Sequence, residues 1–297
     1  MRFSIIIPTF NNLEYLKLCL HSLKKNSKFN HEVIVHNNGN EEPTNSYLKN
    51  NNILFTYTKE NIGITGGVNA GARKASTNYV VYAHDDFYFL PGWDIEWANE
   101  IKNINGNKFY LSGTMVQNGQ VNFYCGDTIE NFDEKKLLDN NHKIKYHDFQ
   151  GSTWAPHVIH KDLWHKVGGF SEEFFPGTGS DPDLNMKLWN SGIRIFKGIN
   201  DFKVYHFGSI VTRKYKNHPS IKTESGSRGA KIFILKWGIS INFFKKFFLK
   251  SDTKFIGELS DPKKNFAYFL NLFICKIYFF YIIFIYNFKN RHNLFTK

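Results

Sequence analysis

Cysteine is scarce in this 297-residue chain, which contains three: Cys19, Cys125 and Cys275. Their odd number argues against a framework of disulfides, and no two of them lie close enough in sequence to resemble a metal-binding pair. We therefore expect reduced thiols that serve as small apolar side chains. The sequence also shows no internal repeat. These absences exclude a disulfide-stapled domain and a repeat protein.

A signal peptide is also missing from the N-terminus, which reads MRFSIIIPTF. The apolar run before Pro8 is only three isoleucines long, which is too short for the apolar region of such a peptide. We therefore expect the protein to remain on the cytoplasmic side of the membrane.

Acidic side chains are few in the last quarter of the chain. Residues 228–297 contain 13 Lys or Arg against 3 Asp or Glu, while the net charge of the whole chain is +12. Residues 1–227 are therefore nearly neutral and the remainder is strongly basic. This asymmetry predicts a catalytic body over residues 1–227 and a basic, aromatic extension over residues 228–297 that binds an anionic surface.

Residues 266–286 of this extension, FAYFLNLFICKIYFFYIIFIY, carry a single charged side chain, Lys276. The run is long enough to span a bilayer, but a charge near its middle is costly there. Three arrangements are open: a helix lying in the membrane interface, a span, or packing against the body or a second copy of the chain. We expect peripheral association with the membrane. No recognisable nucleic-acid-binding module is present, so no nucleic acid partner is expected.

The body has the pattern of an α/β protein. Apolar runs predict strands at residues 3–7, 33–36, 53–58 and 79–83. Leucines at positions 13, 16, 20 and 23 form the apolar stripe of a helix after the first strand, and a Gly-rich loop with a short helix precedes the fourth strand. This order favours a mostly parallel sheet with helices on both faces.

The second half of the body gives weaker signals. Residues 105–150 resemble hairpins and loops. A helix is expected to begin near Asp181, with this residue as its N-cap. The segments RIFKG and FKVYHFG are expected to form two short strands, which places His206 at a strand end.

Polar residues follow three of the expected strands: Pro8-Thr9, Asn37-Asn38-Gly39 and His84-Asp85-Asp86. In open α/β sheets, ligands bind beyond the carboxyl ends of the strands. Asp85 and Asp86 therefore either belong to an acidic loop that caps the next helix or bind Mg²⁺ or Mn²⁺ that bridges a diphosphate. His206 is a candidate second ligand for such an ion.

Six segments carry a family resemblance: FSIIIPTFNN, EVIVHNNGN, ENIGITGGVNAG, YVVYAHDDF, VGGFSEEFFPGTGSDPDLNMKLWNSG and VYHFGS. In their order and spacing, residues 1–240 resemble family 2 glycosyltransferases with the GT-A fold. A KWG tripeptide at 236–238 also resembles one often seen late in bacterial members. The resemblance implies an inverting transferase that takes a sugar from a nucleoside diphosphate sugar, with a UDP-sugar as the favoured donor.

The resemblance also implies roles for the donor-side residues. Pro8 and Thr9 match the loop that usually cradles the base. Asn37 stands where the family often has an Asp that binds base or ribose. Asn61 and Gly63 match the loop on the nucleotide side.

The segment His84-Asp85-Asp86 matches the acidic signature of the family, with His84 in place of the common first Asp. The resemblance implies that Asp86 binds Mn²⁺ or Mg²⁺ and that His206 completes the metal site. His84 and Asp85 are expected on the nucleotide side of this motif.

The catalytic helix carries the remaining implied roles. Asp181 falls at the position of the general base and Asp183 at that of a supporting acid, while Ser180 replaces the usual Glu. Trp154 either stacks on the acceptor sugar or packs in the core. The other histidines, including His157, are expected to be ordinary surface or core groups.

We therefore expect an enzyme that adds one sugar to a glycan or lipid-linked acceptor in surface polysaccharide assembly. A catalytically degenerate scaffold that binds nucleotide sugar at the membrane is the alternative, because Ser180, Asn37 and His84 depart from the family pattern. A nucleotidyltransferase would need Arg and Lys in a Gly-rich loop after the first strand, which PTFNN lacks. A nonenzymatic membrane-interaction protein that works through residues 228–297 is a further alternative.

Overall fold

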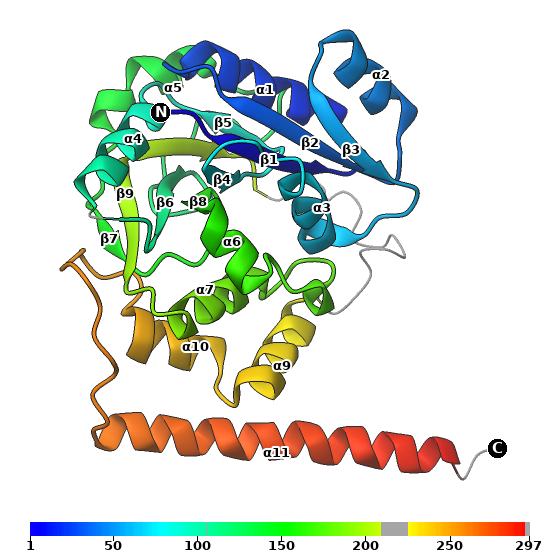
Figure 1. The fold of residues 1–297 in the computed structure, drawn as a ribbon, viewed down its shortest axis with the longest axis vertical. Coiled ribbons are helices and arrows are strands. Elements are labelled where there is room, and N and C mark those ends of the chain that lie inside the picture. The colour runs from blue at the N-terminus through cyan, green and yellow to red at the C-terminus, as the bar shows by residue number, and fades with distance from the viewer. Residues whose placement is uncertain (105, 209–224, 295–297) are drawn as a thin grey trace.

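The computed structural model describes residues 1–104, 106–208 and 225–294, and one mixed sheet organises the body (Figure 1). Within this described part the sheet holds nine strands, in the order β3-β2-β1-β4-β8-β6-β9-β5, with β7 paired to β9. The strands are β1 (Ser4–Thr9), β2 (Glu32–Asn38), β3 (Leu54–Thr58), β4 (Tyr79–Tyr82), β5 (Phe87–Phe89), β6 (Phe109–Val116), β7 (Phe149–Gln150), β8 (His157–His160) and β9 (Ile195–His206).

The two halves of the sheet differ in strand direction. The pairs β1–β2, β2–β3 and β1–β4 are parallel, as expected for continuous apolar strands joined by helices. In the other half β6–β9 is parallel, whereas β4–β8, β6–β8, β5–β9 and β7–β9 are antiparallel. The carboxyl ends of β1, β2 and β4 therefore meet at one edge, which the antiparallel strand β8 borders.

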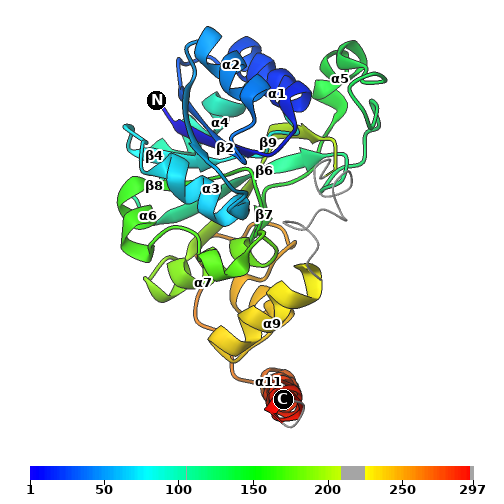
Figure 2. The same cartoon turned by 90° about the vertical axis from the view of Figure 1, so that its right-hand side faces the viewer.

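Helices cover both faces of the sheet. Figure 2 shows α1, α2 and α4 above the sheet and α3, α6 and α7 below it. The helices of the body are α1 (Leu13–Asn26), α2 (Glu42–Asn50), α3 (Gly63–Ala72), α4 (Trp93–Asn103), α5 (Glu134–Asp139), α6 (Lys161–Val167) and α7 (Ser180–Asn190), with short turns η1 (Asn141–Lys143) and η2 (Glu172–Phe174).

Three local expectations were wrong. Helix α2 lies between two strands that were expected to follow each other directly, and β6 is a fully buried strand inside the segment expected to hold hairpins and loops. The two short strands near residue 200 are one strand, β9, whose register with β6 shifts between Gly113 and Thr114. Asn200 and Asp201 lie at this irregularity, which explains why the sequence there resembles a turn.

The C-terminal part consists of α9 (Ser225–Trp237), α10 (Ile241–Phe243), η3 (Phe244–Leu249) and α11 (Phe266–Leu294). The expected boundary between residues 227 and 228 falls within α9. An Arg228 guanidinium nitrogen donates to the Phe175 carbonyl oxygen, so the start of this helix is joined to the body.

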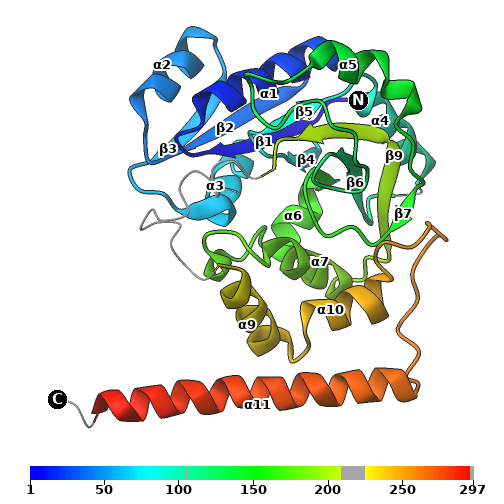
Figure 3. The same ribbon diagram turned by 180° about the vertical axis from the view of Figure 1, so that it is seen from behind.

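Helix α11 runs beneath α9 and α10, at the end of the molecule opposite α1 (Figure 3). It touches them along one side: Cys275 is buried, its sulfur accepts a hydrogen bond from the Ser240 amide at 3.3 Å, and the rings of Tyr268 and Phe243 lie 5.0 Å apart. Its other side exposes large apolar side chains. Among the described residues, the stretch Phe266–Tyr286 is the one helical segment long and apolar enough to cross a membrane.

Candidate active site

The carboxyl ends of β1 and β4 are joined by a direct hydrogen bond. Thr9 Oγ1 donates to Asp85 Oδ2 at 2.7 Å, and both side chains are buried. The pKa of Asp85 is raised to about 7, mainly by burial and also by the neighbouring charge of Asp86, while the Thr9 hydroxyl opposes these effects. Two of the three polar segments expected at this edge of the sheet, those after β1 and β4, therefore lie together.

Asp86 lies between two histidines. Its carboxylate is 3.8 Å from His84 Nδ1 and 3.6 Å from His206 Nε2. The antiparallel register of β5 and β9 pairs Phe87 with His206, which brings the end of β9 beside the end of β4. One ligand atom from each of His84, Asp86 and His206 lies within 4.8 Å of the others. The expected pair Asp86 and His206 is thus brought together, and His84 joins it.

The chemistry of this donor set fits a divalent cation. One carboxylate oxygen and two imidazole nitrogens suit Mn²⁺ better than Mg²⁺, which prefers oxygen ligands alone. Burial lowers the pKa of His84 to about 4, although the neighbouring Asp86 charge opposes this effect. The His84 ring is therefore neutral at pH 7, which is the form that binds metals, and it stacks on Phe87 with ring centroids 4.7 Å apart.

The donor-side loop after β3 is held by short polar contacts. Asn61 Oδ1 accepts a hydrogen bond from the Gly63 amide at 2.8 Å, and Asn38 Oδ1 accepts one from the Ile62 amide at 3.1 Å. Gly63 has a φ of +73°, and a Cβ there would lie 2.8 Å from the Phe175 ring. Asn38 belongs to the polar segment expected after the second strand, but no role was assigned to it from the sequence, because its role depends on a contact with the loop after β3.

Asn37, near the end of β2, contacts the beginning of α2. Its side chain is fully buried, and its amide nitrogen donates to the Glu41 carbonyl and to Asn45 Oδ1, both at 2.9 Å. These bonds hold the beginning of α2 against β2. A contact between Asn37 and a nucleotide stays a prediction.

Asp181 lies in the first turn of α7. The N-cap of this helix is Gly179, which has a left-handed conformation with φ +88°. The expected N-cap was therefore wrong by two residues, because Gly179 lets the chain enter the helix earlier. Burial raises the pKa of Asp181 to about 7, although its side chain keeps 21% of its surface exposed. A carboxylate of this pKa can accept a proton near neutral pH.

Tyr82 connects Asp181 to the candidate metal ligands. Its buried hydroxyl has a pKa raised well above the usual value by burial, and further by the charges of Asp181, Asp86 and Asp85. Its ring lies 5.3 Å from that of His84 and 5.4 Å from that of His157. Tyr82, the last residue of β4, therefore lies near both Asp181 and the cluster of His84, Asp86 and His206.

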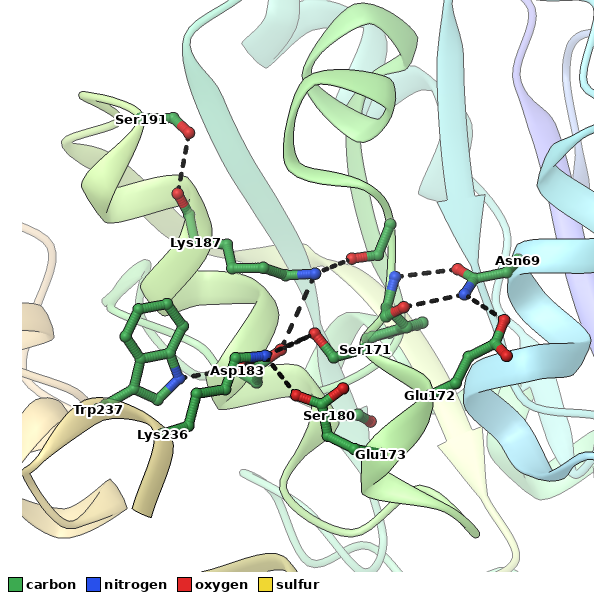
Figure 4. Close-up of polar contacts among 12 residues, drawn as sticks. Asn69, Ser171, Glu172, Glu173, Ser180, Asp183, Lys187, Ser191, Lys236 and Trp237 are labelled. Carbon is green, nitrogen blue, oxygen red and sulfur yellow. Dashed lines mark hydrogen bonds and ion pairs between the residues drawn. The ribbon is translucent and has the colours of Figure 1, made fainter. Parts of the chain in front are cut away.

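Asp183 ties the helix of Asp181 to the C-terminal part (Figure 4). It is fully buried: Oδ1 accepts from Trp237 Nε1 at 2.9 Å and lies 3.0 Å from Lys236 Nζ, while Oδ2 accepts from Ser171 Oγ at 2.6 Å. Lys236 also pairs with Glu173 at 2.7 Å. Asp183 therefore supports α7 through the residues of the KWG tripeptide, a connection that the sequence did not reveal.

Trp154 is half-buried and packs at the edge of the core. Its ring stacks on Phe149 with centroids 6.3 Å apart, and Lys245 Nζ lies 5.4 Å from the ring centroid. These contacts match its expected core packing, and a contact with an acceptor sugar stays a prediction.

A family model described as glycosyl transferase family 2 matches residues 4–161, slightly more than half of the chain. The uncharacterized glycosyltransferase RP339 of Rickettsia prowazekii is 27% identical over 175 residues, which make up 57% of this chain and 53% of that protein. The uncharacterized glycosyltransferase YfnE of Bacillus subtilis is 37% identical over 93 residues, or 29% of this chain and 23% of that protein. The chain thus spans about half or less of the length of these relatives.

Solved structures show a similar fold. The crystal structure of S. aureus TarS 1–349 aligns with a TM-score of 0.53 at 18% identity, covering 69% of this chain and 60% of that one. TarS 1–349 in complex with UDP-GlcNAc aligns with a TM-score of 0.51 at 17% identity, covering 69% of this chain and 58% of that one. The expected fold class, a GT-A-like α/β sheet with a helical C-terminal extension, is confirmed.

Proposed function

The chain belongs to glycosyl transferase family 2, and on this premise we propose that it transfers one sugar from a nucleoside diphosphate sugar to a hydroxyl group of a glycan or lipid-linked acceptor. The observation that carries the proposal is that Asp181 and the cluster of His84, Asp86 and His206 both lie near Tyr82, at the end of β4. This arrangement supplies a proton acceptor and a site for the diphosphate at the same sheet edge. The fold similarity to a TarS structure that contains UDP-GlcNAc supports a UDP-sugar as the donor.

The reaction that this arrangement supports is a single displacement with inversion. The acceptor oxygen forms a bond to the anomeric carbon while the bond to the diphosphate oxygen breaks and that oxygen keeps the electron pair. Asp181 takes the proton of the acceptor hydroxyl as general base. His84, Asp86 and His206 would hold Mn²⁺ or Mg²⁺, which supplies Lewis-acid stabilisation of the charge that develops on the diphosphate.

Residues on the donor side would position the nucleotide. Pro8 and Thr9 follow β1, where Thr9 is already oriented by Asp85, and Asn61 and Gly63 form the adjacent loop. We assign the base and ribose to these loops. Asp85 orients Thr9 in this proposal rather than binding the cation.

Helix α11 supports a membrane-associated acceptor. Its outward side exposes Phe273, Phe280 and Phe284 by 60%, 64% and 64%, whereas its inner side contacts α9 and α10. Because leaving the body to span a bilayer would break these inner contacts, we favour a helix lying in the membrane interface. The site would then work at the cytoplasmic face in surface polysaccharide assembly.

A thermal-shift series tests the donor site. UDP, GDP, dTDP and CMP are each added to the full chain with and without Mn²⁺. We expect UDP to raise the melting temperature only with Mn²⁺, and the substitution Asp86→Ala to abolish the increase. No increase with any nucleotide, together with no release of UDP from UDP-sugars, would favour the non-catalytic scaffold instead.

A further inference from the structure

His157 is a buried histidine beside the proposed base. It begins β8, where it pairs with Tyr82 of β4, and its side chain is fully buried. The rings of Tyr82, Tyr110 and Phe170 surround it at centroid distances of 5.4, 4.8 and 5.9 Å. On its remaining side, Nδ1 lies 3.7 Å from Asp181 Oδ1. Aromatic rings thus restrict His157, and the atom that faces a polar neighbour is Nδ1.

Three polar atoms at this point have no hydrogen-bond partner among the described residues: Nδ1 and Nε2 of His157 and Oδ1 of Asp181. Buried polar atoms are nearly always hydrogen-bonded, because losing their hydrogen bonds to water is costly unless other hydrogen bonds replace them. Two of the three face each other at a separation about half an ångström beyond a hydrogen bond.

We propose that His157 is a positioning residue for Asp181: its Nδ1–H donates to Asp181 Oδ1 and leaves Oδ2 to take the proton of the acceptor. This inference rests on the proposed function, because it assumes that Asp181 is the general base. Holding one carboxylate oxygen fixes the direction of the other, and orientation of this kind controls the rate of proton transfer.

The charge state of His157 suits this role. The pKa of His157 is lowered to about 3, mainly by burial and also by the nearby His84, so the ring is neutral. A neutral ring can donate through Nδ1 only in the tautomer that leaves Nε2 unprotonated. The neutral ring can therefore orient Asp181. A cationic ring would stabilise the carboxylate strongly and so make it a weaker base.

The hydrogen bond is tested directly by NMR on the full chain labelled with ¹⁵N-histidine. The His157→Asn spectrum identifies the His157 signals. We expect a neutral His157 with the proton on Nδ1, and a change in its Nδ1 shift in Asp181→Asn. A proton on Nε2 instead, or a His157 signal that Asp181→Asn leaves unchanged, would overturn the proposal. This measurement needs no substrate, so its result is independent of whether transfer occurs.

The catalytic role is tested by UDP release with Mn²⁺ and water as acceptor, from whichever of UDP-GlcNAc, UDP-glucose and UDP-galactose reacts fastest. His157→Leu should lower kcat ~100-fold with little change in donor KM. His157→Asn, whose amide nitrogen replaces Nδ1, should recover most of that loss. His157→Gln, whose amide reaches the Nε2 position, should not. Equal kcat values for the Asn and Gln variants, at similar melting temperatures, would show that His157 is merely structural.

The effect of Asp181→Asn on kcat distinguishes a wrong base assignment for Asp181 from a wrong positioning role for His157. If Asp181→Asn abolishes UDP release and His157→Leu has nearly the wild-type kcat, the base assignment holds and the role of His157 is wrong. If Asp181→Asn leaves kcat unchanged, the base assignment fails and the positioning role fails with it.

Discussion

Phe87 of β5 pairs with His206 of β9, and this register brings the His206 imidazole to 3.6 Å from the Asp86 carboxylate. Asp86 and His206 are 120 positions apart in the chain, and an antiparallel pair of strands brings them together. A slip of one residue would turn His206 to the opposite face of the sheet and remove it from the cluster. The candidate metal site therefore depends on the pairing of β5 with β9 as well as on the identity of its side chains.

Removal of a ligand should weaken Mn²⁺ binding. We expect Asp86→Ala to abolish measurable binding and His84→Ala to weaken it at least tenfold, or about 1.4 kcal/mol. Isothermal titration of the full chain with MnCl₂ measures both. Asp139→Ala, an exposed carboxylate on α5, is the control and should bind as the wild type does. Unchanged affinity in His84→Ala would remove His84 from the proposed ligand set.

The rate of transfer should depend on pH through Asp181. Its pKa is raised to about 7 by burial, and a general base must be ionised to accept a proton. As the pH falls below about 7 the rate should decrease, approaching a tenfold loss per pH unit, and above that value it should level off. Initial rates of UDP release between pH 5.5 and 8.5 measure this dependence. A rate independent of pH across this range would contradict the assignment of Asp181.

Asp183 should contribute more to stability than an exposed acid does. Asp183→Asn removes a buried charge that pairs with Lys236 and leaves Glu173 as the remaining carboxylate partner of that ammonium group. We expect the free energy of unfolding to fall by about 3 kcal/mol, and by about 1–2 kcal/mol in Trp237→Phe, which loses one hydrogen bond to a charged group. Urea denaturation measures both. The control Asp261→Asn breaks an exposed ion pair with Arg194 and should cost less than about 1 kcal/mol.

Gly63 should tolerate no side chain. Gly63→Ala places a Cβ 2.8 Å from the Phe175 ring and 2.9 Å from the Pro176 carbonyl oxygen, in addition to the strain of φ +73°. Gly168 is a matched control, because it has a φ of +74° and nothing within 4 Å of an added Cβ. We expect Gly63→Ala to lower the melting temperature further than Gly168→Ala and to weaken UDP binding with Mn²⁺. Equal melting temperatures would show that Phe175 and Pro176 move aside.

Binding to membranes should depend on the outward side of α11. Phe273→Glu combined with Phe280→Glu should reduce flotation with phosphatidylcholine–phosphatidylglycerol vesicles at least about tenfold, because burying each Phe contributes about 1.5–3 kcal/mol. Tyr57→Glu, at a similarly exposed aromatic position on β3, should float as the wild type does. Vesicle binding that survives the double substitution would favour packing of α11 against another protein surface.

Some of this structure could be predicted from the sequence, and some could not. The strands β1, β2, β3 and β4 have continuous apolar runs, so both their positions and the polar residues at their ends were evident. Helix α2 was missed because it buries only Thr44, Asn45 and Leu48 and has no clear apolar stripe. Strand β6 was missed because nothing in the sequence marks where it pairs.

The site residues also divide into those that could be predicted from the sequence and those that could not. Asp86 and Asp181 belong to local motifs, whereas His157 has no motif and resembles a core histidine. Its position 3.7 Å from Asp181 results from the tertiary fold, which brings the beginning of β8 beside the first turn of α7, and no spacing along the chain encodes that distance. His84 could have been proposed as a ligand, since in an extended segment it lies on the same side as Asp86, two residues later.

The outward side of α11 also determines how the purified protein will behave. An apolar surface of this length does not stay uncovered in water at high concentration, so copies of the chain will associate through it or precipitate. The apparent molecular mass in solution will then change with the detergent present, and an oligomer seen without detergent will reflect covering of α11 rather than an assembly required for catalysis.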